Sequence, residues 1–210
     1  MFIELVDALR CPTPHEESWL VAATSHMAFR HIVDGMLGCP VCHAQYPVTR
    51  GVVDFRSAPH SVSTRDAPAD EQQATRLAAF LDLADGTGFA VLLGAWSVHA
   101  PLLRNLVDTP LIVVNPPDGT EGEPGISILR CDGAIPLAAG AARGVAIDEG
   151  SAARVASAVR ATRAKGRLVA PVSVVLPADV TELARDETVW VAERDTAASP
   201  LVSLHVRRGR

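Results

Sequence analysis

Short apolar runs alternate with segments of helical periodicity in the last two thirds of the chain. The runs are bounded by glycine, proline, aspartate or asparagine, which is typical of strands that end in turns. Seven runs are interpreted as strands: Phe89–Leu93, Leu111–Val114, Ile126–Leu129, Gly144–Ile147, Leu168–Ala170, Thr188–Glu193 and Leu201–Val206. Apolar strands separated by helices predict an α/β fold whose mostly parallel sheet is covered on both faces, and the last two runs predict a hairpin.

The segments between these strands predict three helices. Glu71–Ala84 carries its large apolar side chains on one face and ends before Gly86. Ser97–Val107 is the second helix. Ser151–Lys165 is the third, with Ser151 as its N-cap and Gly166 as its stop.

The first quarter of the chain has a different pattern. Phe2–Leu9 has helix-like spacing, and Trp19–Ala22 is interpreted as a strand. Asp34-Gly35 is typical of a tight turn and predicts a hairpin between the apolar residues on its two sides. Two further short strands, Tyr46–Val48 and Val52–Phe55, flank a turn at Arg50-Gly51. We therefore expect a small β-rich domain at residues 1–56, a linker at 57–70 without periodicity, and an α/β domain at 71–210.

Composition excludes some classes of function. The chain of 210 residues has 19 basic and 24 acidic side chains, and its net charge of −5 does not indicate a nucleic-acid-binding surface. No apolar run is long enough to span a membrane, and the N-terminal residues do not have the pattern of a secretory signal. We expect a cytoplasmic protein whose thiols stay reduced.

Two short cysteine-containing segments predict a metal site. Cys11 and His15 lie in one turn-rich segment, and Cys39 and Cys42 lie in a second. Zinc prefers a tetrahedron of thiolate and imidazole ligands, and ligands two to four residues apart can reach one ion. Four protein ligands leave no open position, so the ion would stabilise the fold and would not activate water.

Other interpretations of these segments stay open at this stage. The cysteines could form disulfides, although Cys131 is remote from the other three. Cys39 and Cys42 have the spacing of a redox motif, and the prolines could form turns without metal. Three more histidines in the same region are alternative fourth ligands: His26, His31 and His43.

The first quarter resembles a known family on three groups of residues. Leu9-Arg10-Cys11-Pro12, Cys39-Pro40-Val41-Cys42 and Tyr46-Pro47-Val48 with Gly51-Val52-Val53 are similar to the zinc-ribbon family of the activator subunit of tRNA and rRNA methyltransferases. The chain departs from that pattern at Pro14, where a second cysteine is expected, and His15 stands in for it. The resemblance implies a protein partner, such as a methyltransferase or a translation-related complex.

Residues 75–208 resemble the class I methyltransferases, which bind S-adenosylmethionine on a seven-stranded Rossmann-like sheet. The resemblance rests on two segments, Asp132–Leu137 and Arg163–Val169. It implies cofactor contacts at Gly94, Asn115 and Asp132. In this family an acid at the end of each of the first two strands and a glycine-rich loop after the first strand hold the cofactor. Here Leu92 and Asn115 stand where the acids are expected, and Trp96 and Val98 stand where glycines are expected. Asp82–Gly88 offers a second possible position for the glycine-rich loop.

Two hypotheses follow from these resemblances. In the first, the chain is a structural zinc protein whose methyltransferase-like domain has lost cofactor binding and serves as a binding or scaffold subunit. In the alternative, it is an active S-adenosylmethionine-dependent methyltransferase with a divergent pocket, lined by Gly94, Asn115 and Asp132, and a fused activator-type zinc ribbon. No run of residues after the strands matches a catalytic motif, so no catalytic residue is predicted.

Overall fold

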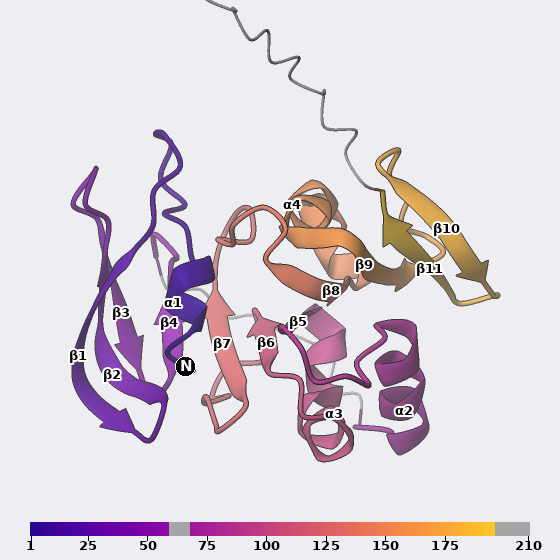
Figure 1. Ribbon diagram of the computed structural model, residues 1–210, viewed down its shortest axis with the longest axis horizontal. Helices are drawn as coiled ribbons and strands as arrows, with labels where there is room; N and C mark the ends of the chain where they lie inside the picture. The colour runs from indigo at the N-terminus through magenta and orange to yellow at the C-terminus, as the bar shows by residue number, and fades with distance from the viewer. Residues whose placement is uncertain (59–67, 196–210) are drawn as a thin grey trace, which may run out of the picture.

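One mixed sheet, with parallel strands at its centre and antiparallel strands at both ends, organises the protein (Figure 1). The computed structural model describes residues 1–58 and 68–195, so the strand predicted at Leu201–Val206 and much of the predicted linker lie outside the described residues. Within them, the strand order is β1-β2-β3-β4-β7-β6-β5-β8-β9-β11-β10. The α/β prediction is confirmed, but the predicted seven-stranded sheet is wrong because the sheet has 11 strands.

Seven of these strands come from the second part of the chain. They are β5 (Ala90–Leu93), β6 (Leu111–Val114), β7 (Ile126–Arg130), β8 (Ala142–Ala146), β9 (Thr162–Pro171), β10 (Val180–Arg185) and β11 (Val189–Arg194). β5 to β9 pair in parallel, and β11 and β10 follow as antiparallel strands. The sequence missed β10 because only its first residue, Val180, is buried and the rest is exposed.

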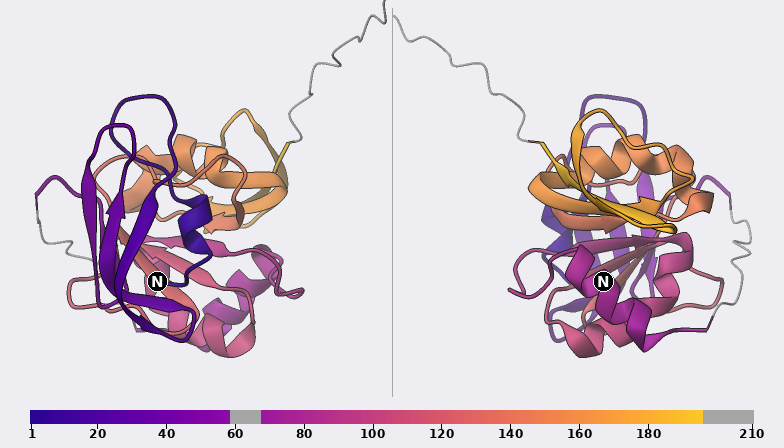
Figure 2. Two further views of the ribbon diagram at one scale, coloured as in Figure 1. Left: turned by 60° about the vertical axis from the view of Figure 1, so that its left-hand side comes forward. Right: turned by 90° about the vertical axis from the view of Figure 1, so that its right-hand side faces the viewer.

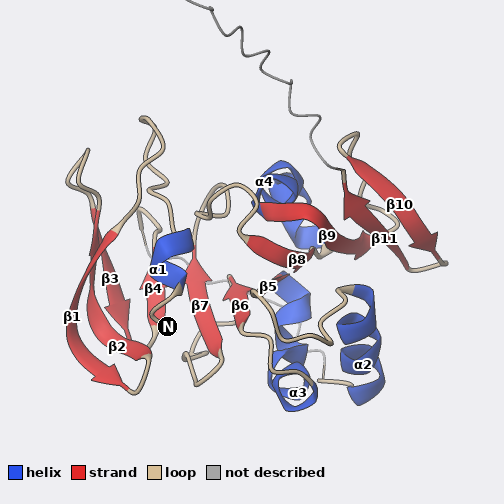
Figure 3. Cartoon of the chain, in the orientation of Figure 1, coloured by secondary structure: helices blue, strands red, loops and turns tan. Residues whose placement is uncertain are grey.

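The first part of the chain supplies the other four strands. β1 (Val21–Ala28), β2 (His31–Gly38), β3 (Gln45–Thr49) and β4 (Val52–Asp54) form an antiparallel meander behind the short helix α1 (Leu5–Ala8). β4 then pairs in parallel with β7, with Val53 opposite Leu129. Both side chains are fully buried, so the meander continues the sheet of the second part (Figure 3).

Helices cover both faces of the parallel strands. α2 (Glu71–Phe80) and α3 (Ala100–Leu106) lie on one face, and α1 and α4 (Val155–Ala161) pack into the core of the other (Figure 2). Alternate residues of each strand feed the two cores: Ala90 and Leu92 face α2 and α3, whereas Val91 and Leu93 face the α4 side. This alternation explains why these strands are apolar throughout.

The predicted hairpin at Asp34-Gly35 is wrong. Both residues lie inside β2, and the turn falls at Phe29-Arg30. Gly35 is needed because a Cβ atom there would lie 2.6 Å from the carbonyl oxygen of Ala23 on β1. A glycine that permits close strand approach and a glycine in a turn look the same in a sequence.

The helix predicted at Ser151–Lys165 is also corrected. A 3₁₀ turn, η2 (Glu149–Arg154), precedes α4, and its N-cap is Asp148 in place of Ser151. The helix ends at Ala161, and Gly166 lies within β9, where a Cβ atom would meet the carbonyl oxygen of Arg143. In the part of the chain described, no helix is long and apolar enough to cross a membrane.

Candidate metal centre and strand-end site

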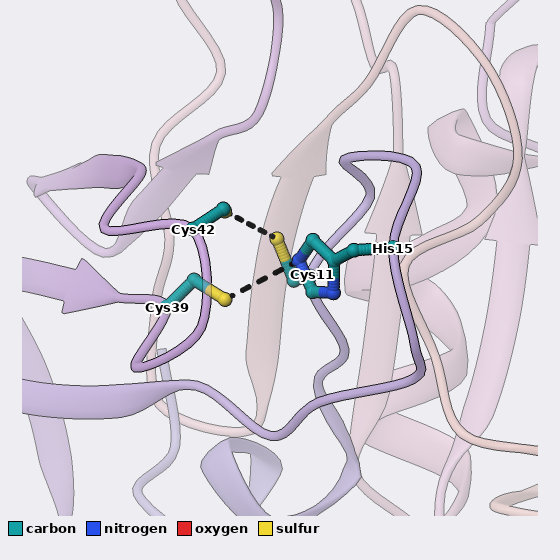
Figure 4. Close-up of side chains that lie close together, drawn as sticks. All are labelled: Cys11, His15, Cys39 and Cys42. Atoms are coloured by element: carbon teal, nitrogen blue, oxygen red, sulfur yellow. Dashed lines mark hydrogen bonds between the residues drawn. The ribbon is translucent and has the colours of Figure 1, made fainter.

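Four side chains from the two cysteine-containing segments meet at one point, as predicted (Figure 4). Cys11 and His15 come from the loop between α1 and β1, and Cys39 and Cys42 come from the turn between β2 and β3. Their donor atoms all lie within 4.8 Å of one another. The meander brings the two segments together because β2 delivers Cys39 at its end and β3 begins just after Cys42.

Two of the distances between donor atoms match those in a zinc tetrahedron, and the remaining ones are no longer than 4.8 Å. Bonds of about 2.3 Å to sulfur and about 2.05 Å to nitrogen place tetrahedral ligands about 3.8 Å apart for two sulfurs and about 3.6 Å apart for sulfur and nitrogen. The Sγ atoms of Cys11 and Cys42 are 3.7 Å apart, and the Sγ atom of Cys39 is 3.4 Å from Nε2 of His15. The set of three thiols and one imidazole therefore fits zinc in size and in chemistry.

Neighbouring groups orient these ligands. Nδ1 of His15 lies 2.5 Å from the carbonyl oxygen of Glu16, and a proton on Nδ1 leaves the lone pair of Nε2 to face the sulfurs. The Tyr46 hydroxyl is 3.2 Å from Sγ of Cys11 and 3.1 Å from Oγ1 of Thr13. Burial raises the pKa of the Cys11 thiol, but the hydrogen bonds with Tyr46 and Thr13 outweigh burial and lower that pKa to about 6. The sulfur is thus largely a thiolate, the form that binds metal, at neutral pH.

Three of the alternative interpretations fit the structure less well. A disulfide requires sulfur atoms about 2.05 Å apart, and all four cysteines are free. Cys39 and Cys42 occupy a turn between strands and not a helix N-terminus, where redox motifs gain their reactivity. Two of the other histidines are engaged elsewhere: His26 lies 3.5 Å from Asp34, and His31 accepts a hydrogen bond from the N–H of Gly125.

The residues predicted for a cofactor, Gly94, Asn115 and Asp132, lie at the carboxyl ends of β5, β6 and β7. Asn115 follows β6 in a left-handed conformation, with φ of 52°. Its amide nitrogen donates to the carbonyl of Cys131, and its amide oxygen accepts from the N–H of Cys131, both at 2.9 Å. The Asn115 side chain therefore extends the β6–β7 pairing by one step.

Gly94 lies against Asp148, an acid that the sequence places just past the fourth strand of the parallel sheet. Oδ2 of Asp148, which follows β8, accepts a hydrogen bond of 3.0 Å from the N–H of Ala95. A Cβ atom on Gly94 would lie 2.2 Å from the same oxygen. The indole nitrogen of Trp96 donates to the carbonyl of Ile147 at 3.1 Å. Residues after β5 and β8 thus bond to each other across the point where ligands bind in open α/β sheets.

Asp132 faces the side of β7 that carries β1–β4 and the two cysteine-containing segments, which are together called the ribbon below. Its Oδ2 atom accepts hydrogen bonds from the N–H and the hydroxyl of Ser57, which follows β4. A cavity of about 750 Å³ lies between this loop and the first cysteine-containing segment, and it reaches Asp132 but neither Gly94 nor Asn115. Arg154 of η2 crosses to the same loop and donates to the carbonyls of Cys131, Asp132 and Gly133 at 3.0–3.1 Å. Nothing in the sequence pattern distinguished Arg154 from other surface arginines.

The second register for the glycine-rich loop, Asp82–Gly88, lies at the wrong end of the sheet. It precedes β5, whereas ligands bind beyond the carboxyl ends of parallel strands. Its polar residues are held by the buried Arg143 of β8, whose guanidinium donates to Asp85 and Thr87. This loop therefore has a structural role.

The contact between Gly94 and Asp148 can be tested by substitution. Gly94 has φ of +53°, and we expect Gly94→Ala to lower the free energy of unfolding by about 1–3 kcal/mol, since the new methyl group meets the carboxylate in a strained backbone conformation. Gly38→Ala is the control, because no atom lies within 4 Å of a Cβ atom there. Urea unfolding measures both, and equal effects would contradict the contact.

No protein-family model matches the chain, and no curated protein matches it. Among solved structures, it is similar to a geranyl diphosphate C-methyltransferase from Streptomyces coelicolor A3(2), with 16% identity and a TM-score of 0.38. That match covers 47% of this chain and 42% of the other, so the chain spans less than half the length of that protein. A methyltransferase from Geobacter sulfurreducens is 11% identical, with a TM-score of 0.41, over 61% of this chain and 81% of that one. A protein from Corynebacterium glutamicum is 14% identical, with a TM-score of 0.42, over 62% and 84%. The chain itself has an α/β fold with one mixed sheet whose central strands are parallel.

Proposed function

We propose that the protein is a structural zinc protein whose methyltransferase-like part does not bind S-adenosylmethionine and acts as a binding or scaffold subunit. The observation that carries this proposal is the set of internal hydrogen bonds at the carboxyl ends of β5 to β8. Asn115, Trp96, Asp148 and Arg154 each bond to a neighbouring loop in the place where cofactor contacts are expected.

A cofactor contacted through the groups that make these bonds would have to replace them. A typical hydrogen bond contributes roughly 0.5–1.5 kcal/mol, and one that involves a charged group roughly 1.5–3 kcal/mol. Arg154 alone donates three bonds, and Asp148 accepts one from the Ala95 N–H. Asn115 also lacks the charge with which an acid would hold the ribose hydroxyls. The residues present therefore do not fit the cofactor that the resemblance implies.

Zinc would hold the ribbon against the rest of the protein. The segment just before Cys11 is hydrogen-bonded to the loop after β7: the N–H of Arg10 donates to the carbonyl of Pro136, and the N–H of Ala138 donates to the carbonyl of Ala8. An ion that fixes Cys11 also fixes this contact. The metal would then stabilise the fold, and the exposed surface of the ribbon would bind a partner protein. Our candidate for this partner is a methyltransferase or a translation-related complex in the cytoplasm.

Calorimetry with S-adenosylmethionine tests the loss of cofactor binding. We expect no binding heat with the zinc-loaded chain and no shift in its melting temperature. A ligand at 100 times its dissociation constant would stabilise the fold by about 2.7 kcal/mol, which such a melting experiment detects readily. Saturable binding at micromolar concentration would overturn the proposal, and circular dichroism of the same sample serves as the control for folding.

One observation favours the alternative, an active methyltransferase with the ribbon fused to it. The Oδ1 atom of Asp148 is buried and has no hydrogen-bond partner among the described residues. A buried acceptor of this kind is a place where the donor of a ligand could bind. The alternative predicts micromolar binding of S-adenosylmethionine that Asp148→Asn weakens, so the same calorimetry separates the two functions.

A further inference from the structure

The cavity of about 750 Å³ beside the metal cluster is built by both parts of the chain. Residues 11–14 and Tyr46 line it from the ribbon, and residues 131–136 line it from the loop after β7. Tyr46 and Phe55 pack against each other in its lining, with ring centroids 4.8 Å apart. Its volume lies within the range of about 300–1,000 Å³ that is usual for sites of small molecules. The cavity is therefore large enough to hold a ligand.

Two arginines give one end of the cavity a positive charge. Arg10 and Arg160 line it and hold Glu17 between them: Nε of Arg10 lies 3.1 Å from one carboxylate oxygen of Glu17, and Nη1 of Arg160 lies 3.0 Å from the other. Arg160 also donates to the carbonyl of Leu137 at 2.7 Å, which fixes its guanidinium group. Two guanidinium groups thus share one carboxylate, and each has more N–H donors than these bonds use. This end of the cavity can accept a second carboxylate.

Carboxylates predominate at the other end, which is lined by Asp54, Arg56 and Asp132. Nε and Nη2 of Arg56 donate to the two oxygens of Asp54 at 2.9 and 2.6 Å, which pairs these two charges. Asp132 accepts hydrogen bonds of 3.0 and 3.1 Å from the N–H and the hydroxyl of Ser57, a neutral residue. Arg154 donates to backbone carbonyls of the same loop but is not among the described residues that line the cavity. The described lining therefore has two carboxylates and one guanidinium group here, which favours a cationic group.

The two charged ends are separated by the length of a short chain. Arg154 contacts the carbonyl of Asp132 near one end, and Arg160 contacts the carbonyl of Leu137 near the other. These two arginines lie six residues apart in η2 and α4, which corresponds to about 9 Å along a helix at about 1.5 Å per residue. Three residues of extended peptide span about 10 Å. A tripeptide therefore has the length that connects the two ends.

We propose that this cavity binds a short apolar peptide with free termini, its α-carboxylate at Arg10 and Arg160 and its α-ammonium group at Asp132. Such a ligand brings one negative and one positive charge, and both make charge-assisted hydrogen bonds. Its apolar side chains contact Tyr46 and Phe55 and lose their exposure to water. A nucleotide fits less well, since its phosphate brings a charge of about −1.5 to −2 and no cation for Asp132. This inference goes beyond the proposed function and does not depend on it.

Calorimetry with the tripeptide Ala-Leu-Ala tests the site on the full chain. The free tripeptide is expected to bind saturably. Its N-acetylated and C-amidated forms are each expected to bind at least about tenfold more weakly, because each loses one charged terminus. Arg160→Gln should weaken the free peptide by a similar factor and have little effect on the C-amidated one. Asp132→Asn should also weaken the free peptide and have little effect on the N-acetylated one.

Arg185→Gln is the matched control, because Arg185 pairs with Glu182 on β10 and lies outside the cavity. It should leave every affinity unchanged, and circular dichroism of each variant checks that the fold is kept. Absence of binding heat at millimolar peptide would overturn the proposal, and so would equal affinity of the three peptides. An Arg160→Gln or Asp132→Asn variant that weakens the blocked peptide as much as the free one would also overturn it, because the side chain would then not act on that terminus.

Discussion

Cys39→Ser is expected to abolish zinc binding and to lower the free energy of unfolding by more than about 4 kcal/mol, an effect of the size that follows loss of a structural metal. Cys39 is 3% exposed and belongs to the core of the ribbon, so the loss of the ion also disturbs apolar packing. Structural zinc sites contribute about 10–16 kcal/mol of apparent binding free energy in small zinc peptides, which leaves room for a large effect. Elemental analysis of the purified protein should give one zinc per chain for the wild type and none for the variant.

Cys131→Ser is the matched control for this substitution. Cys131 is 2% exposed and lies outside the four-residue cluster, so the variant loses a buried thiol but no metal ligand. We expect it to keep its zinc and most of its stability. A chelator should lower the stability of the wild type to nearly that of Cys39→Ser and should leave the stability of Cys39→Ser itself unchanged. Equal stability of the wild type with and without the ion would contradict a structural zinc.

Val53→Asp is expected to have the second large effect, a loss of about 4 kcal/mol or more, because it places a carboxyl group at the buried junction of β4 and β7. Val53 is fully buried and pairs with Val48 on one side and Leu129 on the other. The charge would separate the ribbon from the parallel strands. Urea unfolding should show the loss of stability, and limited proteolysis should release the ribbon from the remainder of the chain.

Val175→Asp is the control for the junction. Val175 is 84% exposed in the loop after β9, so the same change of side chain should alter the free energy of unfolding by less than about 0.5 kcal/mol. If Val53→Asp unfolds at the same urea concentration as this control, the ribbon and the parallel strands do not depend on each other.

The cysteine ligands could be found in the sequence because each pair of ligands lies in one short turn. Spacing along the chain fixes which side chains can share an ion within a turn, and Cys39 and Cys42 are such a pair. Spacing alone favours His15 as the fourth candidate ligand less strongly, because His26, His31 and His43 also lie near the cysteines in the sequence. The structure makes that choice, since β1 and β2 carry His26 and His31 away from the cluster and the loop carries His15 into it.

The sequence predicted only in part how the residues at the carboxyl ends of the parallel strands are arranged. The replacement of expected acids and glycines by Asn115 and Trp96 indicated a changed site. It did not indicate that Asn115 would bond to Cys131, or that Asp148 and Arg154 would bond to the neighbouring loops. These contacts join residues from different strands, and no spacing along the chain predicts them.

The sequence by itself determined most of the buried strands, the two turns that carry the candidate metal ligands and the α/β class, because apolar periodicity and short spacings are local properties of the chain. Only the tertiary structure decided that the ribbon and the parallel strands share one sheet. The pairing of β4 with β7 joins residues more than 70 positions apart, and it depends on backbone hydrogen bonds that every residue type can make. The same reason applies to β1, whose place at the edge of the sheet follows from how all the other strands pair.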